Sequence, residues 1–137
     1  MNAFRDDVFS QLRANRSSNS IDVLAELAFE RAIAASRKLA VFRRNAATWE
    51  LLLLLALSEG DDETGIYELI GRVESRALGN SALLKFLREQ TDAGMLQLLS
   101  GRAKRSRRVL RLEPTIVEEL VKLLHRRNRL ISSHPGL

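Results

Sequence analysis

The stretch LLSGRAKRSRRVLRL, residues 98–112, sets a run of cations between two groups of leucines and contains no acidic residue. The cations are Arg102, Lys104, Arg105, Arg107, Arg108 and Arg111. A disordered basic tail has no need of flanking leucines, and a buried strand would not tolerate so many charges. The pattern predicts a surface hairpin, with strands at 95–100 and 107–112 joined by a turn at 101–106.

Helical patterns dominate the chain before this hairpin. Ser20 is placed to cap a long helix from Ile21 to Arg43 or Arg44. Apolar residues recur along it in a stripe that predicts either intrachain core or a dimer contact: Leu24, Leu27, Ala28, Ala32, Ala35, Leu39 and Phe42. A second helix, 46–57, is apolar nearly all round and is therefore expected at the centre of the core.

Three further helices follow the same logic. The third covers 66–74, with Thr64 as its expected cap. The fourth covers 81–93; Asn80 or Ser81 can cap it, and Gly94 is placed to end it. Beyond the hairpin, Pro114 takes the first position of a last helix over 115–130.

The composition indicates a protein with an aliphatic core. The 137 residues are 45% hydrophobic but only 5% aromatic, and the absence of cysteine excludes disulfides and thiol chemistry. The longest apolar run, LLLLLAL at 51–57, is far short of the ~18 residues of a membrane span. No secretory signal is evident at the start of the sequence, so we expect a cytoplasmic protein without a membrane partner.

The net charge of +5 is concentrated in one place. Residues 1–100 carry 12 basic and 14 acidic side chains, whereas 101–112 carry six basic and none acidic. A concentrated basic element on a near-neutral chain favours a polyanionic partner, nucleic acid before acidic lipid, although a solvated loop is the plain alternative.

Three helices followed by a two-stranded hairpin is the element order of a winged helix. We therefore expect a mainly α protein with a small β-hairpin, in which leucines anchor the strands and the basic tip meets the backbone of a duplex. Unlike a free tail, a hairpin holds its charges in a fixed place.

At 81–114, the sequence SALLKFLREQTDAGMLQLLSGRAKRSRRVLRLEP resembles the MarR-type winged helix-turn-helix transcriptional regulators of bacteria. AGML (93–96) is similar to the glycine turn after the family's recognition helix, and RRVLRLEP (107–114) to its second wing strand and next helix. The wing departs from the family pattern, because KRSRR (104–108) has only basic and serine residues where the family has an aspartate.

The resemblance implies a sequence-specific regulator that binds double-stranded DNA as a homodimer. It divides the chain into an N-terminal segment and linker (1–20), a long dimerisation helix (21–45), a winged-helix domain (46–114) and a C-terminal dimerisation helix with tail (115–137). It also implies a possible small-molecule effector, for which the sequence indicates no pocket.

Helix 81–93 is the expected recognition helix. Leu83, Leu84 and Leu87 most simply face the core. The groups left for DNA are Asn80, Ser81, Lys85 and Arg88. Asn and Arg are suited to base edges, and Lys and Ser to phosphates or base acceptors, although surface and capping roles explain the same residues.

The wing, 101–108, is expected on the DNA backbone or in a minor groove, where a narrow geometry concentrates negative potential. Its expected contacts are Arg102, Lys104, Arg105, Arg107 and Arg108, whereas Arg111 can pack its stem along the sheet.

Catalytic and metal-binding patterns are not found. His125 and His134 have no spaced ligand partner, and the acidic stretch 58–63 lacks the spacing of a calcium loop. The sequence contains no phosphate-binding loop and no nucleophile elbow, so we expect no enzyme and no cofactor. Two alternatives stay open: a winged-helix module for protein interaction or non-specific DNA assembly, and an RNA-binding protein. The scarcity of aromatic residues disfavours single-strand stacking.

Overall fold

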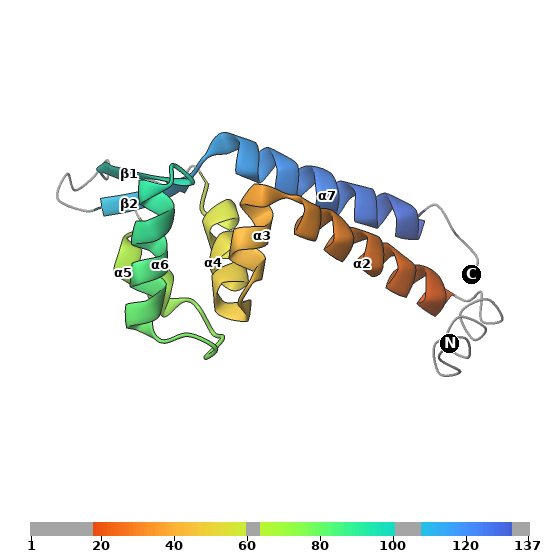
Figure 1. Cartoon of the computed structure of the whole chain (residues 1–137), viewed down its shortest axis with the longest axis horizontal. Helices are drawn as coiled ribbons and strands as arrows, with labels where there is room; N and C mark the ends of the chain where they lie inside the picture. Colours follow the sequence, from red (N-terminus) through yellow and green to blue (C-terminus); the bar gives the residue numbers. More distant parts are fainter. Residues whose placement is uncertain (1–17, 60–63, 101–107, 133–137) are drawn as a thin grey trace. The chain divides into compact units, whose positions relative to one another are not determined.

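The computed structural model describes residues 18–59, 64–100 and 108–132, which are mainly helical with a two-stranded antiparallel sheet (Figure 1). The elements are α2 (Ser18–Ala35), α3 (Arg37–Arg43), α4 (Ala46–Leu57), α5 (Ile66–Gly71), α6 (Asn80–Asp92), β1 (Leu96–Ser100), β2 (Arg108–Leu112) and α7 (Pro114–Ser132). The predicted class, mainly α with a small hairpin, is confirmed. No helix within these ranges combines the length and apolar character that crossing a bilayer requires.

The chain divides into two compact units. Residues 34–120 form the central unit, and the described parts of 1–33 and 121–137 form the terminal unit. Both α2 and α7 pass from one unit into the other.

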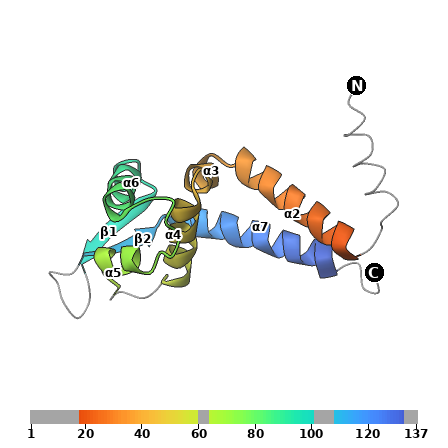
Figure 2. The same ribbon diagram turned by 90° about the horizontal axis from the view of Figure 1, so that it is seen from below.

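The hairpin of the central unit pairs Leu96 with Leu112 and Ser100 with Arg108, within one residue of the predicted strands. An isolated antiparallel bridge joins Gly65, just before α5, to Val109 of β2. This bridge ties the start of α5 to the sheet. Figure 1 and Figure 2 show α5, α6 and the hairpin lying together at one end of the central unit.

The core of the central unit is aliphatic, as the composition predicts, and α4 lies at its centre. Leu51 and Leu52 of α4 have no exposed surface, and Leu55 is almost fully buried. α4 contacts α3, α5, α6 and β2. Burying a leucine side chain contributes about 1.5–3 kcal/mol, so this one helix supplies a large share of the unit's stability.

The long helix predicted from Ile21 to Arg43 or Arg44 is wrong, because the backbone leaves the helix at Ser36. Ser36 is extended (φ −86°, ψ 121°), and its hydroxyl accepts the N–H of Leu39 at 3.1 Å. A serine that caps the following turn competes with a continuous helix, and here the cap prevails. The result is two helices, α2 and α3.

The buried face of α2 also differs from the predicted stripe. Ala25, Phe29 and Ile33 are buried, whereas Leu24 and Leu27 are 51% and 43% exposed. Both faces of the helix carry apolar residues, and the interpretation of the stripe as intrachain core is wrong at Leu24 and Leu27, whereas its interpretation as a dimer contact stays a prediction. Within the terminal unit, Arg127 of α7 forms an ion pair with Glu26 at 3.0 Å, and its guanidinium lies 4.5 Å from the ring centre of Phe29.

Three predicted caps are wrong. Ser20 lies inside α2, which begins at Ser18. Gly65 and Gly79, in extended conformations, take the cap positions expected for Thr64 and for Asn80 or Ser81. Two other boundary predictions are confirmed: Pro114 begins α7, and Gly94, with φ +80°, follows the end of α6 in the left-handed conformation that favours glycine.

Glu113 fastens the hairpin to α7. Its carboxylate accepts the Thr115 hydroxyl, the Thr115 N–H (3.2 Å) and the Lys38 ammonium from α3 (3.1 Å). The Glu113 N–H donates to the carbonyl of Met95 at the start of the hairpin. The bonds from Thr115, followed by the smaller effect of Lys38, hold the pKa of Glu113 below its ordinary value.

This lowered pKa predicts acid sensitivity. The stability contributed by ionised Glu113 is present above the ordinary glutamate pKa of 4.5 and is lost as the pH falls through the lowered folded value. We expect the free energy of unfolding of Glu113→Gln to fall less on acidification below pH 4.5 than that of the wild type. Urea unfolding followed by circular dichroism across this range measures it.

Glu118→Gln is the matched control, because Glu118 is an exposed carboxylate on the same helix. If both variants follow the wild-type pH dependence, the Glu113 carboxylate contributes nothing to acid sensitivity.

Candidate nucleic-acid interface

The outer face of α6 carries three of the four predicted contact residues in one row. Leu83, Leu87 and Gln90 of this helix are buried, which turns the opposite face outward. Ser81, Lys85 and Arg88 are exposed at spacings of four and three residues. Asn80, at the start of the helix, is exposed as well.

Charge changes sign along this face of α6. The basic residues Lys85 and Arg88 lie in the first nine residues of the helix, whereas the exposed acids Glu89 and Asp92 lie at its end. The first nine residues of the helix, which start at the positive end of its dipole, are therefore the part suited to a nucleic acid.

Two other side chains of α6 lie between its core and its outer face. Leu84, expected in the core, is only half-buried and lines a surface groove. Phe86 is half-buried and meets Phe42 of α3 edge to face, with ring centres 5.4 Å apart. This contact is worth about 0.5–1.5 kcal/mol beyond the area buried and stabilises α6 against the core.

Glu50 of α4 holds the turn that leads into α6. Its two carboxylate oxygens accept the backbone N–H groups of Glu74 and Ser75, each at 2.8 Å. These bonds lie beyond the end of α5, which stops at Gly71 rather than at residue 74 as predicted. After Gly71 the N–H groups of Arg72 and Val73 bond three residues back, to the carbonyls of Leu69 and Ile70, and those of Glu74 and Ser75 bond to Glu50, 24 and 25 residues away in sequence.

The wing prediction lies largely outside the described residues. Arg102, Lys104, Arg105 and Arg107 belong to 101–107, which the structure does not describe. Arg108 begins β2 and is exposed, while Arg111 is half-buried and lies opposite Gln97. Buried Val109, Leu110 and Leu112 attach β2 to the core, so Arg108 starts from a fixed strand.

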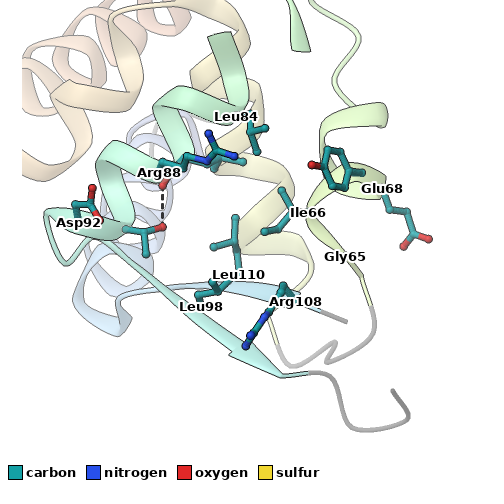
Figure 3. A pocket seen from close by; sticks show the side chains of 12 residues that line it. Gly65, Ile66, Glu68, Leu84, Arg88, Asp92, Leu98, Arg108 and Leu110 are labelled. Carbon is teal, nitrogen blue, oxygen red and sulfur yellow. Dashed lines mark hydrogen bonds between the residues drawn. The ribbon is translucent and has the colours of Figure 1, made fainter. Parts of the chain in front are cut away.

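A groove of about 840 Å³ lies among α5, α6 and the hairpin. Figure 3 shows Ile66 and Leu110 between Arg88 of α6 and Arg108 of β2. The acids Glu68 and Asp92 also line it, so the groove is apolar inside and charged at its edges. Sequence reasoning missed this groove, because its lining comes from segments more than 40 residues apart.

Metal binding finds no support in the part of the chain that is described, where no three histidine, aspartate or glutamate side chains come together. Comparisons with protein-family models, with curated proteins and with solved structures find no match for this chain. Functional inference therefore depends on the chemistry of the residues themselves.

We expect Glu50→Ala to lower the free energy of unfolding by about 1–3 kcal/mol, because two backbone donors lose a charged acceptor. Glu68→Ala is the matched control, since within the described residues Glu68 makes only an exposed 3.7 Å ion pair with Arg72. Urea unfolding of both variants measures the difference. Equal losses would contradict the role given to Glu50.

Proposed function

We propose that this chain is a sequence-specific, double-stranded DNA-binding transcriptional regulator of the MarR-like winged-helix type, acting as a homodimer in the cytoplasm. The observation that carries the proposal is the row of Ser81, Lys85 and Arg88 on the exposed face of a helix that leads directly into a basic hairpin. The element order supports a winged helix: α4, α5 and α6 precede the hairpin, and the Gly65 bridge joins α5 to it.

In this proposal α6 enters the major groove with its first nine residues, Asn80 to Arg88. An α-helix fits that groove, and its exposed side chains reach base edges there. Arg88 is suited to paired hydrogen bonds with guanine, and Asn80 with adenine. Lys85, which lies between Ser81 and Arg88 on the same face, contacts phosphate or a base acceptor. Glu89 and Asp92 keep the C-terminal end away from phosphates.

The wing, 101–108, supplies the sequence-independent part of the affinity. Arg105, Arg107 and Arg108 neutralise phosphates and release counterions, which makes binding dependent on salt. The buried strand residues that hold Arg108 give this charge a fixed position relative to α6, because both elements pack in the central unit.

A second copy of the chain is proposed to cover the exposed apolar face of α2. Val23, Leu24 and Leu27 are 58%, 51% and 43% exposed, on the side away from buried Ala25 and Phe29. Three large apolar side chains exposed on one helix are typical of a contact surface rather than of scattered surface residues.

The groove is also the candidate effector site of this regulator. Its apolar lining, with both arginines and acids at the edges, fits a small and largely apolar molecule that carries a polar group. Since Arg88 is one of the proposed DNA contacts, such a molecule would compete directly with DNA.

Fluorescence anisotropy across a salt series tests DNA binding, with the DNA upstream of the protein's own coding region and a random duplex as probes. We expect Lys85→Ala to weaken binding to the upstream duplex about tenfold. A triple change of Arg105, Arg107 and Arg108 to Ala should reduce the log–log salt slope by about two to three, at about 0.9 per phosphate contact.

A charge-matched triple change of Arg31, Arg37 and Arg44 to Ala, on exposed positions of α2, α3 and the turn after α3, is the control. Equal affinity for both duplexes would favour a non-specific assembly module. Tighter binding to structured RNA would favour the RNA-binding alternative, and no binding to either would leave a protein-interaction module.

The dimer is tested by Leu27→Asp, which places a charge on the exposed face of α2. We expect the wild type to sediment as a dimer at micromolar concentration and the variant as a monomer, because burying an unpaired carboxylate opposes association. Leu57→Asp, at an 84% exposed leucine of α4, is the control and should leave the dimer intact. A monomeric wild type would remove the dimer from the proposal.

A further inference from the structure

The C-terminal half of α7 presents a second basic surface, separate from α6 and the wing. Lys122, Arg126 and Arg129 are exposed at spacings of four and three residues, which places them along one face of the helix. His125 is exposed beside them. We call the three cations the C-terminal basic stripe.

The fourth cation in the C-terminal half of α7, Arg127, lies on the inward side of the helix. Arg127 is turned toward α2, where it pairs with Glu26 and lies over Phe29. Leu123 and Leu124 are half-buried on this side. The sequence therefore separates one structural arginine from three outward cations, and 121–132 contains no acid to neutralise them.

Helix stability explains only part of this arrangement. Cations in the last turn of a helix are stabilised by its dipole, each by about 0.3–1 kcal/mol, and Arg129 lies in that turn. The effect decays within one turn, whereas Arg126 and Lys122 lie further from the helix end at Ser132. Among the described residues, none of the three stripe cations forms an ion pair.

The geometry of the stripe fits a linear polyanion better than a single acidic group. Lys122 and Arg129 are seven residues apart, or about 10 Å along the helix axis. Duplex DNA carries about one charge per 1.7 Å of its axis, so several phosphates lie within the length that the three cations cover. The stripe contains no aromatic side chain for stacking, which favours the phosphodiester backbone of a duplex over single-stranded bases.

We propose that the C-terminal basic stripe is a second contact with the phosphodiester backbone of duplex DNA. The inference rests on the proposed function and extends it, because further phosphate contacts add affinity without sequence choice. It gives DNA only the face of α7 that carries the stripe, whereas the exposed apolar residues Val121 and Ile131 of α7 and the apolar face of α2 are left for the second copy.

The test compares the wild type with a triple change of Lys122, Arg126 and Arg129 to Ala in the anisotropy salt series on a 40-base-pair duplex of about four helical turns. We expect the salt slope to fall by about two to three, at about 0.9 per phosphate contact. The triple change at Arg31, Arg37 and Arg44 removes the same charge and should leave the slope unchanged. A conservative set, Lys122→Arg with Arg126→Lys and Arg129→Lys, should keep the wild-type slope.

Each outcome of this test either supports or overturns the proposed DNA contact of the stripe. Equal slopes for the wild type and the stripe variant would overturn this inference even if Lys85→Ala still weakens binding. If the stripe variant reduces the salt slope but the α6 and wing variants do not, the inference is supported. The proposed contacts of α6 and the wing with DNA are then contradicted. Absence of duplex binding by the wild type would overturn both. Loss of binding to phosphatidylserine vesicles, with duplex binding unchanged, would assign the stripe to a membrane surface.

Discussion

The central unit depends on the exclusion of water from the leucines of α4. The helix AATWELLLLLAL contributes Leu51, Leu52 and Leu55 to a core built with α3, α5, α6 and β2. The one charged residue of α4, Glu50, is half-buried and accepts two backbone donors ahead of α6. α4 therefore lies at the centre of the core and also holds the turn that precedes α6, the helix proposed to contact DNA bases.

The hairpin and α6 were predictable because their signals are local. Gly94 favours the left-handed turn after α6, Pro114 begins the next helix, and the apolar residues of β2 recur at strand spacing. The break at Ser36 was missed because serine occurs inside helices as well as at their N-caps, and the sequence alone does not show which role it takes. The turn after α5 is held by Glu50, a partner that no local pattern reveals, so the predicted extension of the helix to residue 74 could not be corrected from the sequence.

In the candidate site, too, some features follow from local sequence patterns and others do not. Exposure of Ser81, Lys85 and Arg88 follows from the helical period once Leu83 and Leu87 are placed in the core. The groove beside them does not follow, because the fold brings Ile66 and Leu110 together from parts of the chain 44 residues apart. In α2 two faces carry apolar residues, so the helical period cannot decide that Phe29 is buried while Leu24 and Leu27 are exposed.

Trp49 of α4 lies half-buried beneath Arg43, whose guanidinium is 4.9 Å from the centre of the indole ring. It is the single tryptophan of the chain, and the single tyrosine, Tyr67, belongs to the same central unit. Indole emission therefore reports on the central unit alone, whereas far-ultraviolet ellipticity averages over the helices of both units. The protein thus carries a built-in spectroscopic label, with which the melting of its central unit can be followed separately from that of α2 and α7.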